Sequence, residues 1–308
     1  MVTKEGKKWN LPYSIDSGLI LSRLDFLRAA KVNPPKKGYT WDEFYGMAKA
    51  AMKPPEYYGV GFQFSKASSD CESTFSMMMF SFGASIVKED SKTLNVKTKE
   101  MAEFLNYAVK TWEMGVYPPG VTGWDNSSNN TALQDGKVVF IHNPASPLVW
   151  ARQNKPDLVP NIGVHAMPAG PKGSFASAYV RDGWVLFKST PDKRQDLVIS
   201  LMRHLYSRDV YRKWMELAFP APAVAGMEDL EIWKNPQRAG FLEAAKTGVL
   251  DGYPGTPTPA YSELGTRLPV ISMILRVIID KWTPDKAIDE LDQVARDVFR
   301  KHYPDMKY

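Results

Sequence analysis

Residues 17–32 read SGLILSRLDFLRAAKV, and this stretch changes from one periodicity to another. Its first half is a short apolar run of the kind found in buried strands, whereas its second half spaces apolar residues as an amphipathic helix does. Strands interspersed with helices are typical of the α/β class. We therefore expect an α/β protein.

Signals further along the chain support this class. TWDE at residues 40–43 is a capping box, in which Thr40 caps a helix and Glu43 answers at its third position. Pro191 is expected at the first position of a helix that carries Leu197 and Leu201 four residues apart. The other expected helices cover 73–85, about 98–114, 132–137, 209–218, 236–248, 264–282 and 284–298, and the expected strands cover 57–62, 138–144 and 177–188.

Bulk composition narrows the function classes. The chain has 308 residues, of which 44% are hydrophobic and 24% charged, as in an ordinary globular protein of one large or two smaller domains. Its net charge of +5 is scattered, and no basic stripe predicts nucleic-acid binding. No segment reaches the roughly 18 apolar residues of a membrane span. The single cysteine, Cys71, is either a buried small hydrophobe or a nucleophile that needs a nearby histidine.

Motifs that bind metals or cofactors are missing from the sequence. It contains no HExxH or CxxC pattern and no phosphate loop. Gly59 and Gly61 supply only two of the three glycines of a dinucleotide fingerprint. We therefore expect neither a metal nor a cofactor. Asp125 and Asp182 could face each other as the carboxylate pair of a glycoside hydrolase, so this alternative stays open.

Polar and aromatic residues are mixed in four short segments. These are GWDNSSNN (123–130), IHNP (141–144), RDGW (181–184) and GYPG (252–255). A pyranose stacks its apolar face on Trp or Tyr, while its hydroxyls need partners that donate or accept, such as Asn, Asp and Arg. Each segment alone is also compatible with an ordinary turn, but together they favour a sugar site.

The order of these segments resembles one known family. KKWNLPYSID…GYTWDEF (7–44), GVYPPGVTGWDN…ALQDGKVVFIHNP (115–144), VHAMPAGPKG (164–173) and RDGWVLFKST (181–190) are similar to successive motifs of the sugar-binding members of the extracellular solute-binding proteins of ABC importers, related to maltose-binding protein. The similarity extends from Trp9 to Tyr303. The chain departs from the family pattern at Ala145, where family members carry a tryptophan, and at Arg23 and Leu24.

The resemblance implies a two-lobed, periplasmic-binding-protein-like fold of type II in the α/β class. It also implies that the chain is N-terminally truncated, because family members precede this point with a signal peptide and about a hundred residues of first lobe, the size of a small domain. The expected domains are a second α/β lobe at 14–180, a remnant of the first lobe at 181–252, and a hinge return with C-terminal helices packing on the second lobe at 253–308.

The function that the resemblance implies is binding rather than catalysis. We expect the substrate-binding component of an ABC importer, located in the periplasm, which holds a sugar or polyol between its lobes, closes by hinge motion and delivers the ligand to the permease. An inactive or interaction-only fragment of such a protein is the alternative. The expected ligand-binding residues are Asp16, Asp70, Glu72, Trp124, Asp125, Asn126, Asn143, Arg181, Asp182, Gly183, Trp184 and Tyr253.

Overall fold

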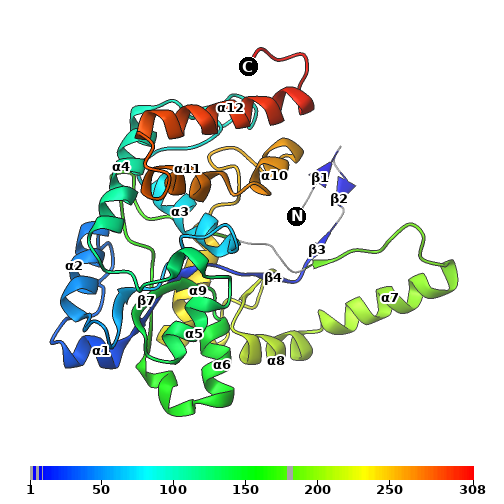
Figure 1. Ribbon diagram of the computed structural model, residues 1–308. Coiled ribbons are helices and arrows are strands. Elements are labelled where there is room, and N and C mark those ends of the chain that lie inside the picture. Colours follow the sequence, from blue (N-terminus) through cyan, green and yellow to red (C-terminus); the bar gives the residue numbers. More distant parts are fainter. Residues whose placement is uncertain (1–2, 5–6, 9, 179–182) are drawn as a thin grey trace.

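A four-stranded sheet forms the centre of the larger part of the molecule (Figure 1). The computed structural model describes residues 3–4, 7–8, 10–178 and 183–308. The strand order is β6-β7-β5-β8, in which β6 and β7 are parallel and β5 is antiparallel to both neighbours. The strands are β5 (Leu19–Arg23), β6 (Tyr58–Val60), β7 (Val138–Asn143) and β8 (Ile162–His165). The expected α/β class is confirmed.

Helices cover both faces of this sheet. Successive side chains of a strand point to opposite faces, so Ile20 and Phe140 belong to one core cluster and Leu21 and Ile141 to another. The first cluster includes residues of α1 (Leu24–Ala29), α2 (Trp41–Ala51), α3 (Ser69–Ser81), α4 (Lys99–Glu113), α10 (Pro259–Gly265), α11 (Pro269–Ile278) and α12 (Pro284–His302). The second includes residues of α5 (Ser128–Gln134), α6 (Ser146–Asn154) and α9 (Pro236–Thr247). We call this three-layered body the large unit.

Local sequence signals explain where several helices begin. The capping box of α2 is present: the Thr40 hydroxyl accepts from the Glu43 amide at 3.2 Å, and the Glu43 carboxylate accepts from the Thr40 amide at 2.7 Å. Thr98 caps α4 in the same way through the amide of Met101, at 3.2 Å. By contrast, α3 begins four residues before the predicted 73–85 helix.

A small unit lies beside the large one and contains short strands and the helices that follow them in the chain (Figure 1). Strand β3 (Leu11–Pro12) pairs with β9 (Gly183–Trp184), and β4 (Ser14–Ile15) pairs with β10 (Ala221–Pro222). Helices α7 (Asp192–Leu205) and α8 (Arg208–Ala218) follow β9. The small unit has its own core cluster of Tyr13, Tyr211, Met215, Met227 and Trp233. A further pair, β1 (Thr3–Lys4) with β2 (Lys7–Lys8), precedes it.

Helix α7 extends from the body of the molecule (Figure 1). It carries exposed apolar side chains. Leu197 is 69% exposed and Leu201 is 53% exposed, whereas Leu205 packs against the core of the small unit. Pro191 occupies the N-cap of this helix, one position before the predicted place. The leucines spaced four residues apart therefore mark a helix face that the described chain does not cover.

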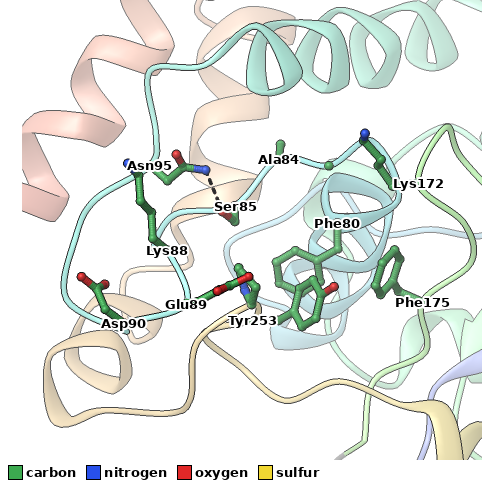
Figure 2. A pocket seen from close by; sticks show the side chains of 12 residues that line it. Phe80, Ala84, Ser85, Lys88, Glu89, Asp90, Asn95, Lys172, Phe175 and Tyr253 are labelled. Carbon is green, nitrogen blue, oxygen red and sulfur yellow. Dashed lines mark hydrogen bonds between the residues drawn. The ribbon is translucent and has the colours of Figure 1, made fainter.

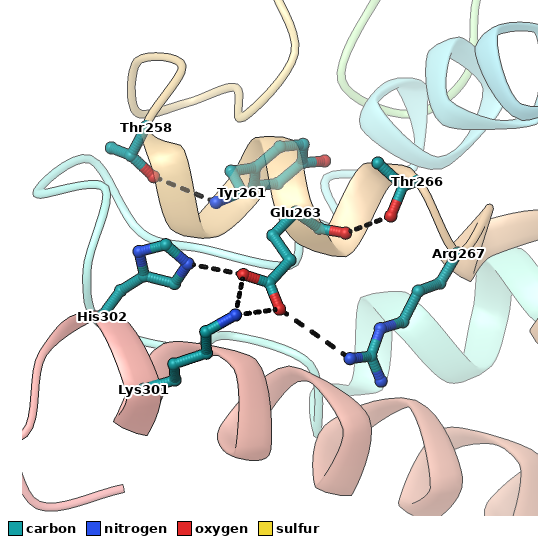
Figure 3. A network of polar contacts seen from close by, with 7 residues as sticks. All are labelled: Thr258, Tyr261, Glu263, Thr266, Arg267, Lys301 and His302. Atoms are coloured by element: carbon teal, nitrogen blue, oxygen red, sulfur yellow. Dashed lines mark hydrogen bonds and ion pairs between the residues drawn. The ribbon is translucent and has the colours of Figure 1, made fainter.

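The last helices are joined by a charged network (Figure 3). The Glu263 carboxylate of α10 contacts Lys301 and His302 of α12, each at 2.8 Å, and Arg267 at 3.9 Å. These charges lie over an apolar contact, since Leu264 and Phe299 are both buried in the first core cluster. The C-terminal segment is thus fixed to the large unit.

Contacts across the expected domain boundaries are mixed. Helices α7 and α8 lie in the small unit, but α9, which also falls within 181–252, contributes Phe241 to the core cluster that contains Leu19 and Leu21 of the central sheet. The expected domain boundaries stay a prediction.

Candidate functional site

Three parallel strands end at one edge of the central sheet. Strand β6 is parallel to β7, and β5 is antiparallel to both β7 and β8, so the carboxyl ends of β6, β7 and β8 point the same way. The connection from the small unit reaches the same edge, because Leu19, the first residue of β5, pairs with Asn143, the last residue of β7. Open α/β sheets bind ligands outside the carboxyl ends of their strands. We call this region the carboxyl edge.

Helix α3 begins at the carboxyl edge, and Asn126 holds its first turn. The Asn126 side-chain oxygen accepts hydrogen bonds from the Ser68 hydroxyl at 2.8 Å and the Asp70 amide at 3.2 Å. Its amide group donates to the Ser69 hydroxyl at 3.1 Å. A residue 56 positions after Asp70 therefore determines where the helix starts, because its oxygen satisfies an amide that the helix itself cannot.

His142 of β7 is the centre of a buried polar network. The hydroxyl of Thr74 donates to the Asp70 carbonyl at 2.9 Å and lies 2.7 Å from His142 Nδ1. The other ring nitrogen, Nε2, lies beside Gly18, and the tautomer of the imidazole sets which nitrogen donates. Burial lowers the pKa of His142 to about 4, so the ring is neutral at pH 7. Asn129 of α5 donates to the His142 carbonyl at 3.1 Å.

Several buried polar atoms at the carboxyl edge have no hydrogen-bond partner among the described residues. They are Ser17 Oγ, Ser73 Oγ, Asn129 Oδ1 and His142 Nε2. A buried polar atom left unpaired costs about 1–3 kcal/mol, so such atoms are rare and point to bound water or ligand. These four are four of the five such atoms found in the described chain. The carboxyl edge therefore presents uncharged hydrogen-bonding atoms that make no hydrogen bond with the described residues of the protein.

Glu72 is committed to a structural contact. Its two carboxylate oxygens accept from the amides of Val270 at 3.0 Å and Ile271 at 2.9 Å, at the first turn of α11. Burial raises the pKa of Glu72 to about 7, and the negative charge of Asp251 acts in the same direction. Glu72 thus joins α3 to α11, directly behind the carboxyl edge.

The other polar residues of GWDNSSNN also make local contacts. The Asp125 carboxylate accepts from the amides and hydroxyls of Ser127 and Ser128 at 2.8–3.0 Å, and these bonds lower the pKa of Asp125. It thereby caps the start of α5. Trp124 is partly buried and packs against both core clusters. Much of this segment therefore holds α3 and α5 in position.

Asn143 and Asp16 also reach the carboxyl edge. Asn143 is buried, donates to the Asn130 side chain and accepts from the Ser146 hydroxyl at 3.1 Å. Asp16 lies on the connection between β4 and β5.

The remaining predicted residues lie elsewhere. Gly183 and Trp184 belong to the small unit, where the Trp184 ring meets Tyr13 edge to face at 5.9 Å. Tyr253 packs at the opposite end of α3 (Figure 2). Arg181 and Asp182 lie outside the described residues.

Sequence reasoning missed most of the central network. Ser17, Ser73, Thr74, Asn129 and His142 were not among the predicted ligand residues. The available signal was a buried polar side chain beside apolar ones: Ser73 and Thr74 directly before the apolar run of α3, and His142 near the end of an apolar strand.

Other site types find no support in the described residues. Cys71 is buried, and burial raises the pKa of its thiol to about 12, so this sulfur is not a reactive nucleophile. No group of three or more His, Cys, Asp or Glu side chains could hold a metal ion in the described chain. Within the same residues, every helix is too short or too polar to cross a bilayer.

The central sheet is twisted and has helices on both faces. The chain crosses from this sheet to a smaller unit, and polar groups collect where it crosses. These features define a binding protein of the two-lobed α/β class. The sequence profile of the bacterial extracellular solute-binding proteins matches residues 2–211, more than half of the chain. The chain therefore belongs to this family, as the sequence motifs predicted.

Individual relatives agree with this assignment. A probable ABC transporter-binding protein of Deinococcus radiodurans is 25% identical over 304 residues, which cover 96% of this chain and 70% of that protein. Maltose-bound MalE3 of T. maritima superposes with a TM-score of 0.82 at 21% identity, over 96% of this chain and 74% of that one. A solute-binding protein of Agrobacterium vitis with bound D-mannitol gives a TM-score of 0.76 at 18% identity, over 97% of this chain and 75% of that one. The predicted type II fold is thereby confirmed.

Proposed function

We propose that this chain is the solute-binding component of an ABC importer and that its ligand is an uncharged sugar or polyol held at the carboxyl edge. The observation that carries this proposal is the group of uncharged polar atoms without partners: Ser17 Oγ, Ser73 Oγ, Asn129 Oδ1 and His142 Nε2. Family membership supports it, and so do the maltose and D-mannitol named for two proteins of the same fold.

The chemistry of these atoms suits hydroxyl-rich ligands. A sugar hydroxyl donates one hydrogen bond and accepts two, so it can satisfy a serine hydroxyl and an imidazole nitrogen at once. Because His142 is neutral at pH 7, its ring nitrogen can exchange a hydrogen bond with a ligand hydroxyl without adding a charge to the site. Asp16, Asp70, Asn126 and Asn143 would surround this centre.

The mechanism would be capture without chemical change. The small unit is joined to the carboxyl edge through the segment before β5, and rotation there would open or close the site. The closed form would be the one that the permease recognises outside the cytoplasmic membrane, in the periplasm. A hydrolase role is disfavoured because Asp125 already accepts bonds from Ser127 and Ser128.

The test is calorimetric titration of the whole chain with maltose, D-mannitol and ribitol, comparing the original protein with Ser73→Ala. Removing an unpaired buried hydroxyl should leave stability unchanged or raise it, whereas ligand affinity should fall about fivefold to thirtyfold, equivalent to about 1–2 kcal/mol. Ser262→Ala, at an exposed position of α10, is the matched control and should bind normally.

Three results would count against the proposal. Ser73→Ala binding as tightly as the original protein would remove the carboxyl edge from the site. Release of a shortened sugar during long incubation would favour the hydrolase. A folded sample that takes up no sugar or polyol would favour the interaction-only fragment.

A further inference from the structure

A second cavity lies at the far end of α3, away from the carboxyl edge (Figure 2). Its volume is about 730 Å³, within the range of about 300–1,000 Å³ that small-molecule sites occupy. Asp70 and Phe80 are ten residues apart on one helix, so the cavity is about 15 Å along the axis from the first turn of α3. We call it the Tyr253 pocket; its walls come from the end of α3, from residues 83–95, from residues 172–175 and from Tyr253–Pro254.

Three aromatic rings form one wall of this pocket. Tyr253 packs against Phe80 and Phe175 with ring centroids 5.1 and 5.2 Å apart, and Phe80 and Phe175 are 6.4 Å apart. Phe80 is buried, while Phe175 and Tyr253 are partly exposed. The Tyr253 hydroxyl forms no hydrogen bond with any other described residue. The three rings are tilted by 55–70° to one another, so the wall offers an apolar aromatic surface with one unused polar group.

The facing wall is held in place by backbone contacts. The amide of Thr256 donates to the Ser91 hydroxyl at 2.7 Å, which ties residues 88–92 to the segment after Tyr253. This approach depends on Gly255, because a Cβ there would lie 2.5 Å from the Ser91 hydroxyl. Asp90 closes the turn by accepting from the amides of Lys92 and Thr93. The pocket is therefore preformed, which lowers the ordering cost of binding.

The pocket is lined by charges of both signs. Lys88, Lys172, Glu89 and Asp90 all line it, and Lys88 acts on the Asp90 carboxylate, whereas Lys172 forms no ion pair within the described chain. The Lys172 stem crosses Gly83 so closely that a Cβ added to this glycine would lie 2.9 Å from Lys172 Cγ. The Asp90 carboxylate accepts from Thr93 within its own turn and keeps its negative charge. Lys172 is therefore the cation that remains available to a ligand, and Glu89 is the carboxylate that remains.

From the aromatic wall and the unpaired Lys172, we propose that the Tyr253 pocket is a second binding site, for a small carboxylic acid that carries an apolar ring. The ring packs on Tyr253 and Phe175, and the carboxylate contacts Lys172. This site is separate from the sugar site and does not depend on it. An amino group on the ligand would lie within the influence of Glu89, so a ring-bearing amino acid is one source of the same chemistry.

The experiment titrates the whole chain with phenylacetate, L-phenylalanine and 2-phenylethanol, followed by ligand-detected NMR and by the backbone amide shifts of Ala84 and Ser85. Phenylacetate should bind with a Kd of about 1 mM or tighter, and 2-phenylethanol, which lacks the carboxylate, at least about fivefold more weakly. Lys172→Met should weaken phenylacetate at least about fivefold, and Glu89→Gln should strengthen it about twofold, because it removes a nearby negative charge. Both positions are exposed, so neither variant should unfold.

The controls decide between specific and general effects. Lys49→Met removes an exposed lysine on α2 and should leave phenylacetate binding unchanged. Tighter binding of L-phenylalanine than of phenylacetate, reversed by Glu89→Gln, would identify an amino acid as the ligand type. Equal binding of 2-phenylethanol and phenylacetate, or no effect of Lys172→Met, would overturn the proposal. So would an absence of shifts at Ala84 and Ser85 up to about 10 mM ligand.

Discussion

Replacing Gly18 by alanine tests how tightly the carboxyl edge is packed. A Cβ at this position would lie 2.3 Å from Nε2 and 2.5 Å from Cε1 of His142, and 3.0 Å from the Ser177 hydroxyl. His142 is only 3% exposed, so its ring has little room to move. The added methyl group should therefore displace His142 and break its contact with Thr74.

The expected cost follows from three effects. Overpacking a buried site costs about 1–3 kcal/mol, and loss of one hydrogen bond costs about 1 kcal/mol. Reduced freedom of the unfolded chain returns about 0.4–1 kcal/mol. The free energy of unfolding should therefore fall by about 1–3.5 kcal/mol.

The assay is urea unfolding with a matched glycine as control. Gly46 lies inside α2, and a Cβ added there would have no neighbouring atom within 4 Å, so Gly46→Ala should stabilise the protein by about 0.5–1 kcal/mol. The double variant Gly18→Ala/His142→Ser relieves the clash and should be less destabilised than the sum of its parts. Equal stability of Gly18→Ala and the original protein, or strict additivity in the double variant, would refute the reasoning.

Three further predictions concern stability, binding and association. Burial raises the pKa of Glu72 from its usual value of 4.5 to about 7, so the stability contributed by protonated Glu72 is complete below pH 4.5 and is lost as the pH rises to 7. Glu72→Gln should therefore make the urea denaturation midpoint less dependent on pH between pH 4.5 and 7. The same pH dependence in the variant and the original protein would contradict this assignment. Trp124→Ala should weaken sugar binding by about 1–3 kcal/mol, and because the ring packs against both core clusters it should also lower the melting temperature, which Trp124→Phe should largely restore. Leu197→Lys with Leu201→Lys should reduce self-association in light scattering without loss of stability, since both side chains are exposed; if the original chain is already monodisperse, these exposed side chains do not drive association.

Local signals in the sequence predicted much of the fold. Thr40 and Glu43 lie three residues apart, so their capping box is visible in the sequence and α2 begins where it predicts. The start of α3 was misplaced because its first turn is held by Asn126, which is distant in sequence. A cap supplied by a remote residue leaves no local pattern.

The candidate site was less accessible to sequence reasoning. The composition of GWDNSSNN is visible in the sequence, but composition cannot separate groups that face a ligand from groups that hold helices, as Asp125 does. Tyr253 was grouped with the sugar site by its chemistry, and only the three-dimensional fold places it at the other end of α3. The buried network around His142 depends on the register of β5 with β7, which no single segment encodes.

The ladders that join the small unit are very short, and this limits how the protein unfolds. Strands β3 and β9, and likewise β4 and β10, share only two residue pairs each, whereas β5 pairs along most of its length with two neighbours. Such a unit can open while the central sheet stays intact, so amides of α7 and α8 should exchange with solvent sooner than those of β5 and β7. Thermal unfolding would then proceed in two stages, and a single melting temperature would combine two separate equilibria. A substitution in either unit should therefore be judged by a probe placed in that same unit.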